Sequence, residues 1–316
     1  MEYVTLAHSD LKVSRLCMGG CPLGEYGWGA VDHRELVYAV QSGVANGITM
    51  FDTADVYGLG SSERTLGQAL IGHRDKVVIA TKFGVRVENG ITFYDNSRDW
   101  IQKSVEGSLR RLNTDYIDLY QIHYRDEKIP LSEVVDSLQK LQKEGKIRFF
   151  GLSNITVEDM GELIPFQEQF VSFQDEYSLA TRRNERAIQG IQETLGLTPM
   201  TWGSLGQGIL SGKYSKESLF REDDRRSRDI YMNFHGEKLL HNLKIVDMLR
   251  EISEQNGYSV PAIAIRFILD YIKNSIVLVG MKNKKQLTSN VEAMDFCLDQ
   301  TQIDNLLAIS KYQYND

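Results

Sequence analysis

Several features that would place this chain in a common class of protein are missing from it. Its 316 residues include only three cysteines, Cys17, Cys21 and Cys297, and their spacing matches no metal or redox motif. An odd, low cysteine count suits a reducing compartment, and the stretch Met1-Glu2-Tyr3-Val4 lacks the basic-then-apolar pattern of a signal peptide. We therefore expect a cytoplasmic protein. No apolar run is long enough to span a bilayer.

An excess of positive charge is also missing. Lysine and arginine number 36 against 43 aspartates and glutamates, so the formal net charge is -7. This balance argues against nucleic acid or an anionic membrane surface as a partner. The sequence contains no linker, low-complexity tract or repeat, and we expect one domain over residues 1–316. It leaves open whether the protein is a monomer or a homo-oligomer.

What the sequence does contain is a regular alternation of short apolar runs and helical patterns. Eight candidate strands begin near Leu16, Ile48, Val77, Tyr116, Ile147, Phe170, Pro199 and Ile276. Apolar residues at helical spacing lie between them, as in 36–44, 101–112, 134–141 and 239–252. Eight such units predict an α/β fold of the (β/α)8 TIM barrel type. A doubly wound sheet is the alternative, and the lack of a Gly-x-Gly-x-x-Gly motif after the first strand weakens it.

Two segments depart from the plain barrel pattern. The turn signal His8-Ser9-Asp10 separates two short runs, and it predicts an N-terminal hairpin that caps the barrel bottom. The connection between strands seven and eight is much longer than the others and contains the mixed-charge run 221–229. Such a run is usually a solvated loop. On the catalytic side of a barrel, a loop of this length in 213–238 is also a candidate lid or cofactor clasp.

Titratable residues follow three of the predicted strands. Asp52 and Tyr57 follow the second, Lys82 the third and His123 the fourth. Taken singly, each is more often a structural residue, but the carboxyl ends of barrel strands converge on one face. There Asp52 could hold Lys82, Lys82 could lower the pKa of the Tyr57 phenol, and His123 could orient a carbonyl oxygen. These groups could protonate a carbonyl as hydride arrives, and a cofactor must supply the hydride.

The residues in and around these strand ends match the motifs of a known family. The chain resembles the aldo-keto reductases over nearly its whole length. The matching motifs are Phe51-Asp52-Thr53-Ala54-x-x-Tyr57-Gly58, Ala80-Thr81-Lys82-Phe83, Ser108-Leu109-x-Arg111-Leu112-x-x-Asp115-Tyr116-Ile117-Asp118-Leu119, Gln121-Ile122-His123, Gly145-Lys146-Ile147-Arg148, Gly151-Leu152-Ser153-Asn154, Gln174-x-x-Tyr177, Gly208-Ile209-Leu210-x-Gly212-Lys213-Tyr214 and Gly280-x-x-x-x-x-Gln286-x-x-x-Asn290.

The resemblance implies a catalytic tetrad of Asp52, Tyr57, Lys82 and His123, with Tyr57 as the general acid. It implies that NADP(H) binds across the carboxyl end of the barrel. Ser153, Asn154 and Gln174 would hold the nicotinamide carboxamide, and Tyr177 would stack on the nicotinamide ring. The remaining cofactor residues implied are Trp202, Gly203, Ser204, Leu205, Gly206, Gln207, Gly208, Leu210, Lys213, Gly280, Lys282, Gln286 and Asn290.

The chain departs from its relatives at two of these places. Trp202-Gly203-Ser204-Leu205 stands where many relatives read Tyr-Ser-Pro-Leu, and Gln286 stands where some carry an arginine that grips the 2′-phosphate. We still expect NADP(H) to be preferred, because Lys282, Lys284 and Lys285 precede an apparent helix start. Glycines in 206–208 could free backbone N–H groups for the pyrophosphate.

The substrate is predicted to be a small carbonyl compound that the sequence does not identify. Aromatic residues near the barrel mouth, Tyr26, Trp28, Phe83 and Tyr124, are candidates to wall its pocket. The predicted function is NADPH-dependent reduction of an aldehyde or ketone. One alternative is a nucleotide-sensing, weakly catalytic subunit of a larger assembly. Another is a metal-dependent hydrolase using Asp52, Asp55 and His123, although no second histidine lies nearby; we predict no metal site.

Overall fold

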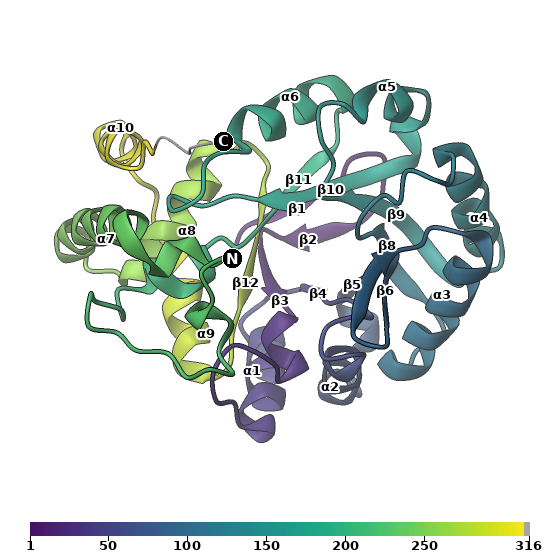
Figure 1. Cartoon of the computed structure of the whole chain (residues 1–316), viewed down its shortest axis with the longest axis horizontal. Coiled ribbons are helices and arrows are strands. Elements are labelled where there is room, and N and C mark those ends of the chain that lie inside the picture. The colour runs from purple at the N-terminus through teal and green to yellow at the C-terminus, as the bar shows by residue number, and fades with distance from the viewer. Residues whose placement is uncertain (313–316) are drawn as a thin grey trace.

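The fold is a closed barrel of eight parallel strands ringed by helices (Figure 1). The computed structural model describes residues 1–312. The strands follow one another around the barrel in chain order: β3 (Leu16–Gly19), β4 (Met50–Asp52), β5 (Val78–Phe83), β8 (Ile117–Ile122), β9 (Ile147–Ser153), β10 (Phe170–Glu176), β11 (Thr198–Trp202) and β12 (Ile276–Gly280). Pairing of β12 with β3 closes the ring. The predicted (β/α)8 barrel is confirmed.

The strands are short and almost wholly apolar because both of their faces are covered. All six residues of β5 and of β8 are buried. Along β8, Leu119 packs inside the barrel, whereas Tyr120 and Ile122 pack against the surrounding helices. This alternation decides which polar side chains reach the barrel interior.

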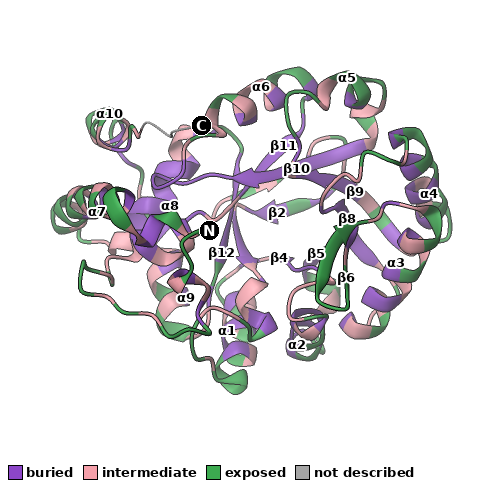
Figure 2. Ribbon diagram, viewed as in Figure 1, coloured by how far each residue is buried: buried purple, intermediate pink, exposed green. Residues whose placement is uncertain are grey.

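The helices pack around the barrel with their apolar stripes inward. They are α1 (His33–Ala45), α2 (Ser61–Ala69), α3 (Arg98–Leu112), α4 (Leu131–Lys143), α5 (Met160–Leu163), α6 (Glu185–Leu195), α7 (Gly236–Asn256), α8 (Val260–Tyr271), α9 (Lys284–Val291) and α10 (Gln300–Ile309). The Ser97 hydroxyl caps α3 by accepting from the Trp100 N–H, and α7 ends at Gly257 in the left-handed region. Figure 2 shows the buried strands inside and the exposed outer faces of the helices.

The N-terminal hairpin closes the amino end of the barrel. Strands β1 (Tyr3–Thr5) and β2 (Lys12–Ser14) pair antiparallel, as predicted, and lie across the middle of the ring in Figure 1. Leu6, Leu11 and Val13 pack against the interior residues Met50 and Leu119. The barrel is therefore plugged at this end, and a ligand has access only from the carboxyl end of the strands.

Two elements were absent from the sequence-based prediction. A second hairpin, β6 (Val85–Glu88) and β7 (Ile91–Tyr94), follows β5. Its turn is Asn89-Gly90, a strong hairpin signal between alternating residues, and it was overlooked. The connection between β11 and β12 also contains a second helix, α8, which is buried on most sides and so lacks the one-sided stripe of a surface helix.

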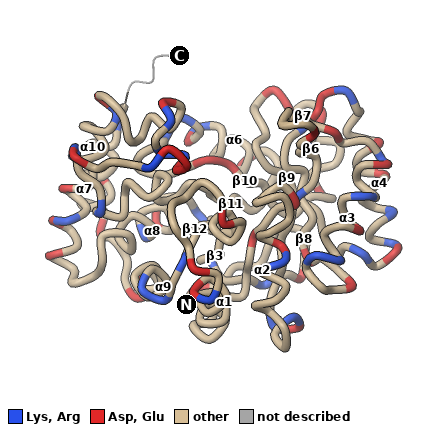
Figure 3. The backbone as a smooth tube through the Cα atoms, turned by 60° about the horizontal axis from the view of Figure 1, so that its bottom comes forward, with Lys and Arg blue, Asp and Glu red and all other residues tan. Residues whose placement is uncertain are grey.

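Charged residues of both signs are spread along the outer helices (Figure 3). Within residues 1–312, no helix has the length and apolar character needed to cross a membrane.

Candidate active site

Four polar side chains meet inside the barrel at the carboxyl ends of neighbouring strands. The Lys82 ammonium donates to Asp52 Oδ1 at 2.5 Å and to the Thr53 carbonyl at 3.0 Å. The other carboxylate oxygen of Asp52 accepts from Gln121 at 3.1 Å and from Gln174 at 2.6 Å. All four side chains are buried. Buried charges need such complete pairing, so both ions of the pair are held in fixed positions.

Tyr57 lies directly above this ion pair. The Lys82 Nζ atom is 5.1 Å from the centroid of the Tyr57 ring, and the ring meets His123 edge-on at 5.8 Å between centroids. The structure thus brings together Asp52, Tyr57, Lys82 and His123 from three different strand ends, as the sequence predicted. Gln121 is a further member of the cluster. It lies two residues before His123 on the same strand face, and that spacing could have revealed it.

His123 is held as a neutral imidazole. Burial, together with the positive charge of Lys82, lowers its pKa well below the usual value. Its Nδ1 atom is buried and has no hydrogen-bond partner among residues 1–312. Leaving a buried N–H unpaired is costly, so the tautomer with its proton on Nε2 is favoured. The backbone carbonyl of His123 accepts from the Asn154 side chain at 3.0 Å.

The pKa of Tyr57 shifts in the direction opposite to our expectation. Burial raises it well above its usual value, and the negative charge of Asp52 raises it further. The predicted net lowering of this pKa is therefore wrong for the structure, in which the Lys82 ammonium is paired with Asp52. Arg225, on the connection after β11, is the cation whose charge opposes the shift. Tyr57 consequently keeps its proton at neutral pH.

A cavity of about 240 Å³ opens beside Tyr57 and His123. Its other lining residues are Cys21, Tyr26, Val56, Gly58, Val85, Thr92, Tyr94, Tyr124 and Arg225. Val85, Thr92 and Tyr94 come from the overlooked hairpin. Tyr124 stacks between His123 and Tyr94, with centroids 5.2 and 4.8 Å away. The wall of the cavity is therefore largely aromatic, and its only formal charge is that of Arg225.

Two of the four aromatic residues predicted to wall the substrate pocket do not line this cavity, whereas Tyr26 does. Phe83 is a correction: it is fully buried and stacks on Tyr120 on the helix side of the barrel. Its neighbour Lys82 faces the interior, so the alternation of strand faces turns Phe83 away. Trp28 is not among the lining residues, and its indole N–H donates at 3.1 Å to the sulfur of Cys21, which is one of them. Tyr124 does line the cavity, as expected.

The ends of β9 and β11 bring several predicted cofactor residues together. The Asn154 amide nitrogen donates to the Ser153 hydroxyl at 3.0 Å, and its oxygen accepts from the Trp202 indole at 3.1 Å. Gln174 lies beside them in register with Ser153. Tyr177 is a correction, because its ring is fully buried and its hydroxyl donates to Glu185 at 2.7 Å. It presents no face to a ligand, whereas Trp202 is only partly buried.

The turn after β11 differs from the predicted phosphate loop. Gly206 and Gly208 have φ of 56° and 106°, and Gln207 shares this left-handed region. The backbone N–H groups in this turn are already hydrogen-bonded. Gly206 donates to the Gly203 carbonyl, and both Gly208 and Leu210 donate to the Leu205 carbonyl. Leu210 is also fully buried, and the Ser204 hydroxyl donates to the Thr201 carbonyl. The expected N–H donors are therefore used within the turn, which Gly203 and Leu205 begin.

Cationic side chains gather near the end of β12. The Lys282 ammonium donates to the Trp28 carbonyl. Burial lowers the pKa of Lys282, and the positive charges of Arg226 and of exposed Lys213 lower it further. Asp224 is the one carboxylate among them, and it pairs with Arg226 at 2.5 Å. Gln286 accepts from the Lys282 N–H at 2.8 Å, Gly280 is exposed and Asn290 is buried. Three cations against one carboxylate leave this cluster positively charged.

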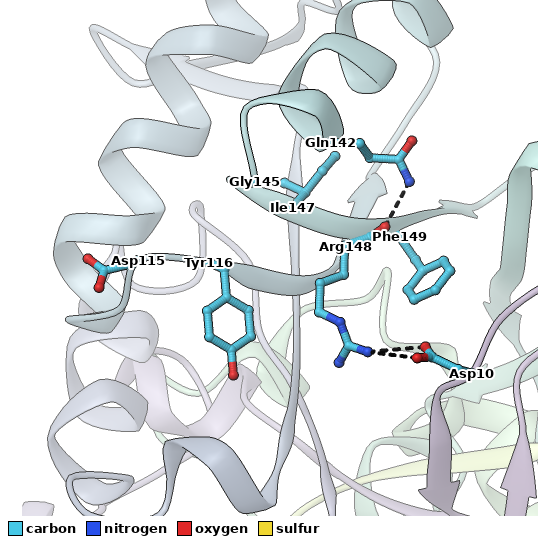
Figure 4. A pocket seen from close by; sticks show the side chains of 8 residues that line it. All are labelled: Asp10, Asp115, Tyr116, Gln142, Gly145, Ile147, Arg148 and Phe149. Carbon is cyan, nitrogen blue, oxygen red and sulfur yellow. Dashed lines mark hydrogen bonds and ion pairs between the residues drawn. The ribbon is translucent and has the colours of Figure 1, made fainter.

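A larger hollow lies at the opposite, amino end of the barrel (Figure 4). It measures about 570 Å³ and is lined by Asp10, Asp115, Tyr116, Gln142, Gly145, Ile147, Arg148 and Phe149. Arg148 donates to Asp10 at 3.1 Å, and Gln142 donates to the Arg148 carbonyl at 2.7 Å. None of the predicted site residues lies here. Residues 1–312 also contain no group of three side chains suited to a metal ion.

Comparison with known proteins agrees with this geometry. The sequence model of the Aldo/keto reductase family matches residues 15–311. Aldo-keto reductase YhdN of Bacillus subtilis is 34% identical over 97% of this chain and 94% of its own length. The structure of glycerol dehydrogenase AKR11B4 from Gluconobacter oxydans superposes with a TM-score of 0.88 at 32% identity, covering 99% of this chain and 97% of that one.

A second solved structure is that of an aldo-keto reductase from Klebsiella pneumoniae in complex with NADPH. It has a TM-score of 0.74 and 26% identity, and the match covers 100% of this chain and 98% of that one. The family match covers nearly the whole chain and agrees with the barrel and with the cluster at its carboxyl end. This chain belongs to the aldo/keto reductase family.

Proposed function

We propose that this chain reduces an aldehyde or ketone to an alcohol with NADPH as the hydride donor, and that Tyr57 is the proton donor. The observation that carries the proposal is the position of Tyr57. Its phenol stays protonated beside a neutral His123, in a cavity and above a fixed Asp52–Lys82 pair. A neutral acid next to a neutral hydrogen-bond donor suits a carbonyl oxygen that gains negative charge.

The residues present fit NADP(H). Trp202 would face the nicotinamide in place of Tyr177, and Ser153, Asn154 and Gln174 would hold its carboxamide. The positive cluster of Lys282, Arg226 and Lys213 suits phosphate groups, which attract lysine and arginine. Complexes of the Klebsiella pneumoniae relative with NADP and with NADPH support this choice. When bound, the cofactor supplies the hydride.

The protein side chains have separate tasks in this reaction. Tyr57 would donate its proton to the carbonyl oxygen, and the Nε2–H of His123 would orient the same oxygen. Lys82 lies 5.1 Å from the Tyr57 ring centroid and would stabilise charge that develops on the phenol. Asp52 fixes Lys82, and Gln121 and Gln174 fix Asp52. The aromatic wall of Tyr94 and Tyr124 would limit access of water.

The test is a panel of aldehydes and ketones added to the purified protein with NADPH, with the fall in NADPH absorbance as the readout. We expect turnover of at least one small carbonyl compound, and formation of the alcohol in equal amount. Tight binding of NADPH without turnover of any member would contradict the proposal, and it would favour the nucleotide-sensing alternative.

A further inference from the structure

Arg225 has a position that the proposed reaction does not use. It belongs to the short turn η5 (Arg225–Ser227) in the connection between β11 and α7, and its side chain lines the cavity with Tyr57 and His123. Its backbone N–H donates to the Gly27 carbonyl at 2.9 Å. A side chain on Gly27 would place its Cβ 2.7 Å from Arg225 Cγ and Nε, so glycine permits this close approach. The arginine is thus anchored over the cavity.

The guanidinium is surrounded by aromatic rings and not by acids. Its central carbon lies 5.2 Å from the Tyr26 ring centroid and 5.7 Å from that of Trp28. Cation–π contacts stabilise a cation without neutralising it. Across residues 1–312, the Arg225 side chain has no ion-pair partner and donates no hydrogen bond, and its buried Nε atom is unpaired.

Neighbouring arginines of the same segment differ in this respect. Arg226 pairs with Asp224 at 2.5 Å, and Arg221 pairs with Asp223 at 3.2 Å. Arg225 alone of the three faces the cavity, and no carboxylate lines the cavity with it. Its charge is close enough to lower the pKa of both Tyr57 and Cys21, against the larger opposing effect of burial. The cavity is therefore electropositive on the side of the proton donor.

We propose that Arg225 is a specificity residue, and that the carbonyl substrates of this site carry a carboxylate that Arg225 binds. This inference rests on the proposed function. A guanidinium offers two parallel N–H donors that match the two oxygens of a carboxylate. At about 240 Å³, the cavity lies below the range of roughly 300–1,000 Å³ that is usual for drug-sized ligands, so a small oxo acid suits it.

The test compares substrates of matched shape that differ in charge. One pair is 4-carboxybenzaldehyde and 4-nitrobenzaldehyde, and the other is 4-oxobutanoate and its methyl ester. The parent should have the higher kcat/KM for the charged member of at least one pair. Arg225→Gln should lower kcat/KM for that member by about ten- to hundredfold, the usual range for a lost hydrogen bond to a charged group, mainly through KM. The neutral member should change by less than about threefold.

Two variants complete the series. Arg225→Lys keeps the charge but not the paired donors, and it should recover part of the preference. Arg221→Gln removes the same charge from the same segment outside the cavity, and it should leave the preference unchanged. Equal losses on both members after Arg225→Gln, or no preference in the parent, would overturn the inference. Weaker NADPH binding by Arg225→Gln with unchanged substrate preference would assign the residue to the cofactor instead, and would also overturn it.

A binding measurement separates this inference from the proposed function. Benzoate and benzamide do not react with hydride, and Trp28 lies next to Arg225, so its fluorescence should report their binding. Benzoate should bind more tightly than benzamide to the parent and lose that advantage in Arg225→Gln. If this holds but no carbonyl compound is reduced, the anion site stands and the proposed function fails. If neutral aldehydes are reduced but benzoate binds no more tightly than benzamide, the proposed function stands and the anion site fails.

Discussion

Two buried aspartates at opposite ends of the barrel show how differently the same residue type is used. At the carboxyl end, Asp52 faces the interior and pairs with the single cation Lys82. At the amino end, Asp118 faces outward and is held by Arg74 at 2.7 Å, Arg148 at 3.0 Å and the Ile79 N–H at 3.0 Å. Both carboxylates are about 2% exposed or less, so burial by itself does not separate them.

The difference lies in what surrounds each pair. Around Asp52 stand Tyr57 and His123, whose polar atoms have no partner of their own or face a cavity. The partners of Asp118 belong to β5, to β9 and to the short turn before β5 that carries Arg74, so these contacts tie β5, β8 and β9 together. The hollow beside this structural pair, at about 570 Å³, is larger than the cavity at the candidate active site. The candidate active site is therefore distinguished by polar atoms that lack hydrogen-bond partners or face a cavity, and not by the volume of that cavity.

The largest expected effect comes from Tyr57→Phe. Loss of a general acid should lower kcat for a substrate of the parent by roughly hundredfold to ten-thousandfold, while the midpoint of urea unfolding and the affinity for NADPH stay nearly constant. Tyr94→Phe removes a hydroxyl from the same cavity and is the matched control, with little expected change in kcat. A near-normal kcat for Tyr57→Phe would contradict the assignment of the carboxyl end of the barrel as the active site.

Asp118→Asn should show the opposite pattern. Removing this charge leaves Arg74 partly buried without its partner, so we expect the free energy of unfolding to fall by about 3 kcal/mol. The kcat of the folded protein should not change. Asp10→Asn is the control, because Asp10 is exposed and pairs with the same Arg148, and it should cost less than about 1 kcal/mol. A selective loss of kcat in Asp118→Asn would show that the amino end also serves the reaction.

The next prediction concerns the preference for NADPH over NADH at the carboxyl end of the barrel. We expect NADPH to bind about ten- to hundredfold more tightly than NADH, which corresponds to about 1.4–2.8 kcal/mol. Lys282→Gln should remove most of that ratio, since Lys282 belongs to the positive cluster. Lys143→Gln, on an exposed residue in the last turn of α4, is the control. Fluorescence titration can follow binding because Trp202 would lie close to the nicotinamide, and NADH binding as tightly as NADPH would refute the preference.

The smallest effect concerns Asp55, a further acidic residue near the candidate active site. Burial and the charge of Glu63 raise its pKa from 3.8 to about 8. Between these values the folded protein holds a proton that the unfolded chain releases, so stability falls as pH rises through this range and levels off above pH 8. Asp55→Asn should therefore flatten the pH dependence of unfolding by about 1 kcal/mol per pH unit near neutrality.

Urea unfolding of the parent and of Asp55→Asn at several pH values would measure this slope. Asp75→Asn changes an exposed carboxyl and should leave the slope as it is in the parent. Parallel curves for the parent and Asp55→Asn would mean that Asp55 is ionised in the folded protein.

Residues close together in the sequence explain what could be predicted. The eight strands are short apolar runs bounded by turn residues, and the N-terminal hairpin is two short runs around a turn signal, so the barrel and its cap could be inferred from local sequence. The tetrad could be inferred because one rule, convergence of strand ends, places Asp52, Lys82 and His123 on one face. The Asn89-Gly90 hairpin was equally local, and its signal, a two-residue Asn-Gly turn between two short alternating runs, could have predicted it.

Other properties depend on contacts between distant segments, and only the tertiary structure decides them. The sequence could not show that Phe83 turns to the helices, that Tyr177 is sealed against Glu185, or that Arg225 reaches Tyr57 across 168 positions of the chain. The raised pKa of Tyr57 likewise depends on its burial and on the nearby negative charge of Asp52. Local sequence patterns were enough to predict which residues stand at the strand ends. The protonation states and orientations of their side chains depend on burial and on pairing with distant residues, which arise only when the barrel closes.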